Sequence, residues 1–253
     1  MLLTTPDAVA LTSLQRFCQF AFKSNPSLSY YLLVVGDCEH MRNRKEYVGF
    51  ISCFNAVRRV NCKIDKGLLW ADRLRSSLLS QFNLSEGLYL DTDIDVIRSM
   101  AYIPALGPEN YLWVPDPIYN DNRRQREMLA DCNISDAGPY AQIGCMYMRK
   151  SAYSAFIHYE VKLRAECDHA FMPGTGIWNA VIRSDTNRNI GETVQCLPLC
   201  SPEYIGSATM YHWTGPIGHS LRWNASYTED GCIVLGCTRS VPPSWLELSR
   251  LRQ

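Results

Sequence analysis

The sequence predicts an α/β protein with one large domain, in which helices and buried strands alternate along the chain. Residues 30–35 form a continuous apolar run rich in aromatic and branched side chains, which suits a strand covered on both faces, as in a parallel sheet. Segments before and after this run have apolar residues at helical spacing. With 253 residues the chain can bury a core that needs no disulfide or metal to stabilise it.

The order of the predicted elements follows from these patterns. The first helix covers residues 12–23 and ends at the Ser-Asn-Pro-Ser sequence that follows it. The strand at 30–35 comes next, and residues 48–60 are apolar enough for a further buried element of unassigned type. The elements predicted after these are a helix at 66–82, a strand at 88–90, a proline-bearing loop region at 104–122 and a strand at 143–148. A helix at 151–166 follows, and a Pro-Gly-Thr-Gly turn at 173–176 begins another helix. We expect one domain at 1–239 and a C-terminal tail at 240–253.

Composition and charge weigh against several classes of function. The chain has 25 basic and 25 acidic residues, so its net charge of zero provides no global field for collecting nucleic acid or anionic membrane. No window is apolar enough for a membrane span and the N-terminus lacks the pattern of a secretory signal, so we expect a cytoplasmic protein. Its eleven cysteines are then expected to be free thiols, and the spacing of Cys196, Cys200, Cys232 and Cys237 is too loose to predict a zinc site.

Three carboxylates follow the apolar strand at 88–90, those of Asp91, Asp93 and Asp95. Because they occupy alternate positions, an extended backbone would point all three to one side. Like charges this close need a cation, and a hard divalent ion such as Mg²⁺ or Mn²⁺, which binds carboxylate oxygens, is the natural partner. The sequence therefore predicts a metal site at this turn.

Other classes of protein also use an acidic turn of this kind. An EF-hand loop that starts at Asp91 would need glycine at its sixth position and glutamate at its twelfth, where this chain has Val96 and Tyr102, so calcium signalling is disfavoured. A metal-dependent phosphatase of the haloacid-dehalogenase type, with Asp91 as nucleophile, fits in part and is the second hypothesis. A binding module with a catalytically degenerate site is the third, and a plain solvated acidic turn is the default for an isolated Asp-x-Asp sequence.

The helix that precedes the strand brings two more charged side chains toward this turn. Asp72 and Arg75 lie three positions apart, so they are neighbours on one edge of the helix, beside its apolar stripe. A short loop at 83–86 then returns the chain to the strand that leads to Asp91 and Asp93. Helix, loop, strand and turn therefore make one local unit.

This unit resembles the sugar-binding DXD region of retaining GT-A glycosyltransferases, among them capsular-polysaccharide and yeast-type mannosyltransferases and the glucosyltransferase domains of clostridial toxins. The resemblance is carried by Ala71-Asp72-x-x-Arg75 and by Gly87-Leu88-Tyr89-Leu90-Asp91-Thr92-Asp93; it is close over residues 68–99 and weaker at 144–150, 173–180 and Tyr211-His212-Trp213. It implies a Rossmann-like, mixed and mostly parallel sheet flanked by helices. It also implies a hexosyltransferase that uses a UDP- or GDP-linked sugar donor and retains the anomeric configuration.

The resemblance further implies what individual residues do. Asp93 would bind the metal, Mn²⁺ or Mg²⁺, directly, Asp91 would reach the donor ribose and the metal, and His212 would complete the metal site or contact the diphosphate. Asp72 and Arg75 would hold the donor sugar. The implied catalytic set is Asp72, Arg75, Asp91 and Asp93, and the implied donor-binding set is Asp72, Arg75, Tyr89, Asp91 and Trp213.

The acceptor of the sugar stays open at this point. A glycan, a protein side chain, a small molecule and a modified nucleic-acid base are all compatible with the sequence, although zero net charge disfavours a nucleic acid. The turn at 173–176 resembles a small-residue turn that lies near sugar and acceptor in the family, and a helix N-cap by Thr175 explains it equally well.

Overall fold

The computed structural model describes residues 2–3, 8–35, 54–60, 70–116, 134, 139–166, 174–194, 196–198, 209–213, 225–227 and 233–235. The predicted tail at 240–253 lies outside these residues, as do the side chains of the four cysteines whose spacing was considered for zinc. Cys18 and Cys145, the cysteines whose side chains are described, are buried thiols that form no disulfide.

The described strands form mixed sheets. The four-stranded sheet has the order β4 (Gly87–Leu90), β7 (Ala141–Met148), β6 (Tyr111–Pro115), β8 (Asn187–Asn189), in which β7 runs antiparallel to both neighbours and β8 runs parallel to β6. A parallel sheet contains β1 (Leu2–Leu3), β2 (Tyr31–Val35) and β3 (Ala56–Val60), in that order. A mixed sheet has the order β5 (Ile94–Val96), β10 (Met210–His212), β9 (Cys196–Pro198). Strands β11 (Ala225–Tyr227) and β12 (Ile233–Leu235) form an antiparallel pair. The α/β class is confirmed, whereas the sheets are not clearly mostly parallel.

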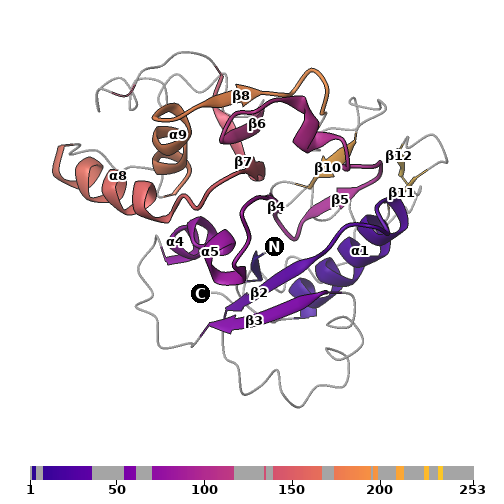
Figure 1. Cartoon of the computed structure of the whole chain (residues 1–253). Coiled ribbons are helices and arrows are strands. Elements are labelled where there is room, and N and C mark those ends of the chain that lie inside the picture. Colours follow the sequence, from indigo (N-terminus) through magenta and orange to yellow (C-terminus); the bar gives the residue numbers. More distant parts are fainter. Residues whose placement is uncertain are drawn as a thin grey trace.

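Helices lie on both sides of the four-stranded sheet (Figure 1). Alternate residues of β6 face opposite sides, because side chains in a strand point to opposite faces in turn. Leu112 and Val114 enter one buried cluster with residues of α1 (Ala8–Ser24), while Tyr111 and Trp113 enter a second cluster with residues of α5 (Leu78–Phe82), α8 (Tyr153–Glu166) and α9 (Thr175–Arg183). The result is a core divided into two parts by the strands.

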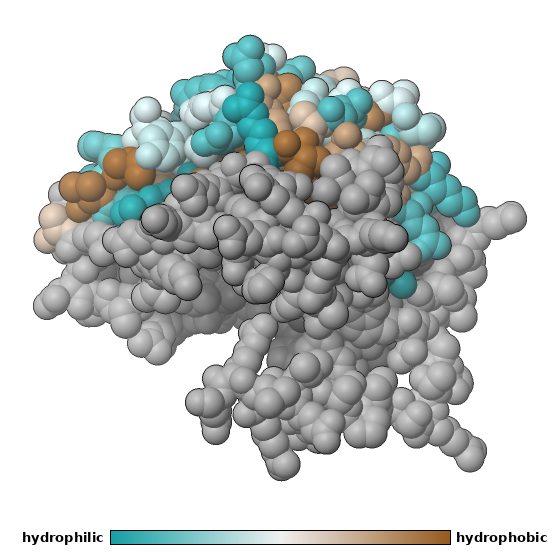
Figure 2. Space-filling model, turned by 90° about the horizontal axis from the view of Figure 1, so that it is seen from below, coloured by the Kyte–Doolittle hydropathy of each residue, from teal (hydrophilic) through white to brown (hydrophobic). Residues whose placement is uncertain are grey.

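The described residues form neither a membrane-spanning helix nor a broad apolar area on the face seen in Figure 2. No described helix is long and apolar enough to cross a membrane. On the face seen in Figure 2, hydrophilic and hydrophobic side chains of the described residues are intermixed, without a broad apolar area.

The loop predicted at 104–122 contains a strand, so this part of the prediction is wrong. Residues 103–106 form the short 3-10 helix η1 (Ile103–Leu106), and Tyr111–Pro115 is β6, an inner strand of the four-stranded sheet. Prolines on both sides of the apolar Tyr-Leu-Trp-Val sequence obscured it, although proline is compatible with the end of a strand. The unassigned apolar segment at 48–60 ends in β3.

The helix predicted at 66–82 is observed as two helices, α4 (Trp70–Ser76) and α5, with residues 66–69 outside the described part. The break lies at Ser77. The hydroxyls of Ser76 and Ser77 donate to the carbonyl oxygens of Arg73 and Leu74, at 2.7 and 2.9 Å. Serine hydroxyls that bond the preceding turn in this way compete with the hydrogen bonds of the helix. The break separates α4, which carries Asp72 and Arg75, from α5.

The C-terminal end of α1 is fastened to the chain that follows β5. The side chain of Asn25 donates from Nδ2 to the carbonyl oxygen of Arg98, at 3.2 Å, and accepts from the amide of Met100 on Oδ1, at 2.6 Å. Ser24 donates to the carbonyl oxygen of Ile97, at 2.9 Å. The predicted helix is confirmed, and these bonds fix β5, which follows the acidic turn, against it.

We expect Asn25→Ala to lower the free energy of unfolding by about 2–3 kcal/mol, because it leaves a buried amide and a carbonyl without partners. Urea denaturation measures this loss. The matched control is Gln19→Ala on the exposed side of the same helix, which should change stability by no more than about 0.5 kcal/mol. Equal effects of the two substitutions would contradict the role of Asn25.

Candidate active site

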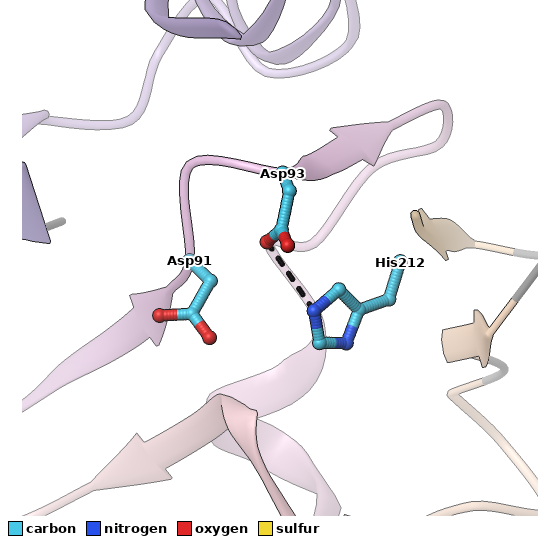
Figure 3. A group of neighbouring side chains, drawn as sticks. All are labelled: Asp91, Asp93 and His212. Atoms are coloured by element: carbon cyan, nitrogen blue, oxygen red, sulfur yellow. Dashed lines mark ion pairs between the residues drawn. The ribbon is translucent and has the colours of Figure 1, made fainter. Parts of the chain in front are cut away.

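Asp91, Asp93 and His212 converge from three parts of the chain (Figure 3). Asp91 follows β4, Asp93 lies in the turn before β5, and His212 ends β10, which pairs with β5 so that His212 faces Ile94 in the antiparallel register. One ligand atom from each residue lies within 4.8 Å of the others, and His212 Nε2 is 3.2 Å from Asp93 Oδ1. Two carboxylates and an imidazole in this arrangement could hold a divalent metal ion.

Asp95 does not join this group, so the prediction that three carboxylates converge is wrong for this residue. Its side chain is fully buried and accepts from Arg16 Nε at 2.7 Å and from the indole N–H of Trp213 at 2.9 Å. The chain turns between Asp91 and Ile94, whose amide donates to the Asp91 carbonyl oxygen at 3.3 Å. Because the backbone is not extended there, alternate residues do not point to the same side.

Trp213 forms hydrogen bonds with Asp93 and Asp95. Its side chain is fully buried, its indole binds Asp95, and its backbone amide donates to the carbonyl oxygen of Asp93 at 3.1 Å. The hydrogen bonds described for Trp213 are therefore with Asp93 and Asp95. Its predicted contact with the sugar donor stays a prediction.

Arg75 connects α4 to the acidic turn. Its guanidinium donates to Asp72 Oδ1 at 2.6 Å and to Asp91 Oδ1 at 3.2 Å, which confirms the predicted proximity of Asp72 and Arg75. It also lies over the ring of Tyr89, 4.9 Å from the ring centroid, and the hydroxyl of Tyr89 donates to Asp91 Oδ1. Both Asp72 and Arg75 are largely buried. Arg75 and Tyr89 therefore both donate hydrogen bonds to the carboxylate of Asp91.

Two glycines make room for the carboxylates. A Cβ at Gly144 of β7 would lie 2.7 Å from Asp91 Oδ2 and 2.8 Å from His212 Cε1, so an alanine there would displace these side chains. Gly174 has a φ of 96° and faces the carboxylate of Asp72, which a Cβ would overlap. Gly174 is also the N-cap of α9, where no side chain caps the helix, so the N-cap interpretation of Thr175 is wrong.

Negative charge dominates the surroundings of His212. Burial lowers the pKa of His212, but the Asp93 carboxylate, followed by those of Asp91 and Asp116, raises it by more, so that the pKa lies above its ordinary value. Burial raises the pKa of Asp72, and the Arg75 guanidinium offsets part of that rise. The site therefore favours a positive charge between Asp93 and His212, whether a proton or a metal ion.

Two residues near His212 were not identified from the sequence. Gln142 of β7 is buried and its amide Nε2 lies 2.5 Å from His212 Nδ1. Asp116 is a buried acid directly after β6. A polar side chain within the apolar run at 141–148 is an available signal for Gln142, because buried polar groups are uncommon in such strands. Asp116 follows β6, which lies in a segment that the sequence predicts to be a loop.

A separate cavity of about 370 Å³ lies between β2, α5 and β4. Its lining is mostly apolar and includes Tyr31, Leu79 and Phe82. Tyr89, which binds Asp91, also lines this cavity, whereas the metal-ligand candidates, Asp72 and Arg75 do not.

No protein-family model and no curated protein sequence matches this chain. Solved structures do match it. The galactosyltransferase LgtC, crystallised with donor and acceptor sugar analogues, has a TM-score of 0.62 and 15% identity, over 85% of this chain and 87% of that one. The bifunctional glycosyltransferase WbbM has a TM-score of 0.56 and 13% identity, over 85% of this chain and 45% of that one. The apo form of the glycosyltransferase GlyE of Streptococcus pneumoniae has a TM-score of 0.54 and 12% identity, over 85% and 54%.

These matches show that the chain has the fold of GT-A glycosyltransferases, as the resemblance of the acidic unit implies. The likeness extends over most of the chain, far beyond residues 68–99. At such low identities it concerns the fold. The chemistry has to be argued from the side chains of this chain.

Trp213→Phe should lower the free energy of unfolding by about 2–3 kcal/mol, because Asp95 is a buried carboxylate that loses a charge-assisted hydrogen bond. The comparison is Trp113→Phe, where the indole donates to the neutral amide of Asn187 and the expected loss is about 1 kcal/mol. Both variants are measured by denaturant unfolding. A larger loss for Trp113→Phe would show that Asp95 does not depend on the indole.

Proposed function

We propose that this protein is a glycosyltransferase that transfers a sugar from a UDP- or GDP-linked donor to an acceptor, with retention of configuration. The observation that carries the proposal is that Asp91, Asp93 and His212 form one group directly beside the Asp72–Arg75 pair. The GT-A fold supports it, because the acidic unit that resembles the DXD region of GT-A glycosyltransferases belongs to a chain with the fold of those enzymes. The retention is implied by the resemblance of that unit.

The three-residue group fits a divalent cation, Mn²⁺ or Mg²⁺. Carboxylate oxygens suit both ions, and an imidazole nitrogen favours Mn²⁺ among the two. The absence of a side chain at Gly144 keeps the space between Asp91 and His212 open. Asp91, Asp93 and His212 would hold the ion, which supplies positive charge against the diphosphate of the donor.

Arg75 and Asp72 would bind the sugar and its adjoining phosphate. Arg75 Nε is buried and has no hydrogen-bond acceptor among the described residues, so the described contacts do not use every donor of the guanidinium. Asp72 supplies carboxylate oxygens that accept from sugar hydroxyls. As the sugar–phosphate bond breaks, negative charge grows on the leaving diphosphate, and a guanidinium held in place by Asp72 and Asp91 stabilises it without reorganising.

The carboxylates of Asp91 and Asp95 have positioning roles in this proposal and do not act as nucleophiles. Asp91 is engaged by Tyr89 and Arg75, and Asp95 is buried against Arg16 and Trp213. We therefore assign no covalent intermediate to these carboxylates. The role we propose for the site is to hold the leaving diphosphate and the sugar so that the acceptor approaches the same face.

The first test is the thermal stability of the protein with Mn²⁺ and a nucleotide sugar. At a hundredfold excess over the Kd, the ligands should raise the Tm by about 5–10 °C, and Asp93→Ala should abolish this shift. Glu192→Ala, which removes an exposed acid outside the site, is the control and should keep it. If neither UDP- nor GDP-sugars stabilise the parent protein, the proposal is wrong.

A second test concerns Arg75 and turnover. Arg75→Lys should lower the rate of nucleoside diphosphate release from the donor by about 100-fold, because lysine keeps the charge but cannot bond Asp72, Asp91 and a phosphate together. Arg188→Lys, at an exposed position, should leave the rate unchanged.

The same assays separate the other two hypotheses. Donor binding without release or transfer, tested over a broad set of acceptors, would indicate a degenerate binding module. Metal-dependent hydrolysis of a simple phosphoester, with a phosphate-mimic adduct on Asp91, would indicate a phosphatase and would overturn the glycosyltransferase proposal.

A further inference from the structure

Gln142 lies in direct contact with the imidazole of His212. It belongs to β7, it is 2% exposed, and its amide Nε2 is 2.5 Å from Nδ1 of the ring. The other amide atom, Oε1, is buried and has no hydrogen-bond partner among the described residues. The opposite ring nitrogen, Nε2, faces Asp93 at 3.2 Å. One side chain therefore contacts the nitrogen of His212 that points away from the acidic turn.

The hydrogen-bonding roles of these atoms are coupled. A neutral imidazole has one N–H and one lone pair, so the partner of Nδ1 decides which role Nε2 has. When the amide NH₂ of Gln142 donates to Nδ1, Nε2 carries the hydrogen and donates to Asp93. When Oε1 of the amide accepts from Nδ1–H, the lone pair of Nε2 faces the acidic turn and can bind a metal ion.

The two arrangements differ by a half-turn of the amide group. The nitrogen and oxygen of a glutamine amide have nearly the same shape, so the turn exchanges a donor for an acceptor with little change in packing. Glutamine is suited to this exchange, because an apolar side chain could take neither role and a carboxylate could take only the second.

We propose that Gln142 is a positioning residue for the metal site, which presents Oε1 to Nδ1–H of His212 and so makes Nε2 a ligand. This inference rests on the proposed function, because it concerns the same metal. Outer partners of metal-bound histidines fix the tautomer and the ring orientation, and their loss typically weakens metal binding by about 10- to 100-fold.

The test compares two substitutions of nearly equal size by the affinity for Mn²⁺ alone, measured from the electron paramagnetic resonance signal of the free ion. Gln142→Met, which cannot accept from Nδ1–H, should weaken Mn²⁺ binding by about 10- to 100-fold. Gln142→Glu, which can only accept, should bind at least as tightly as the parent. If Gln142 only fills space, the buried charge in Gln142→Glu would weaken Mn²⁺ binding as much as Gln142→Met does. That result would overturn the proposal.

A spectroscopic measurement keeps the proposal testable even if Gln142→Met does not fold. Nitrogen chemical shifts of His212 in the parent protein should show the hydrogen on Nδ1 when Mg²⁺ is bound. A ring with its hydrogen on Nε2 in the presence of bound Mg²⁺ would contradict the inference.

The two proposals fail in different ways. A parent protein that binds neither Mn²⁺ nor Mg²⁺ contradicts the metal site of the proposed function. A parent that binds Mn²⁺, together with a folded Gln142→Met variant that binds it equally well, contradicts only the role of Gln142.

Discussion

The buried carboxylate of Asp95 is the constraint on which the acidic turn depends. A charge without exposure to water is tolerated only when it is paired, and here Arg16 of α1 and the indole of Trp213 provide the partners. These bonds tie the first helix and the chain after β10 to the same residue. Because Trp213 directly follows His212, the pairing of Asp95 also determines where the histidine lies relative to Asp93.

A second constraint is the close approach of backbone and carboxylates. Gly144 and Gly174 have no side chain where Asp91, His212 and Asp72 come near, so the strand β7 and the start of α9 can lie directly against them. Arg75 then joins the two halves of the site, with one nitrogen on Asp72 and another on Asp91. The metal-ligand candidates and the predicted sugar-binding pair are in this way one continuous polar site rather than two.

Local patterns predicted much of the fold. Helix α1, strands β2, β4 and β7, and helix α8 were expected close to where they occur, because the strands are short apolar runs and the helices are longer segments that mix apolar and polar residues. Strand β6 was missed because prolines border a short apolar sequence, and the break at Ser77 was missed because it depends on serine hydroxyls rather than on apolar spacing. Pairing between distant strands, which makes the sheets mixed, has no signature in a local pattern.

The local sequence is enough to predict that Asp72, Arg75, Asp91 and Asp93 lie together, because only the segment of α4 and α5, a short loop and one strand connect them, and helical spacing makes Asp72 and Arg75 neighbours. Which further groups belong to this set depends on the tertiary structure. Asp95 does not belong to it, because the backbone turns before Asp95 and α1 supplies Arg16, while Gln142 and Gly144 of β7 contact His212 of β10, a strand far away along the chain. Such contacts depend on long-range strand and helix packing, which residue spacing along the chain does not encode.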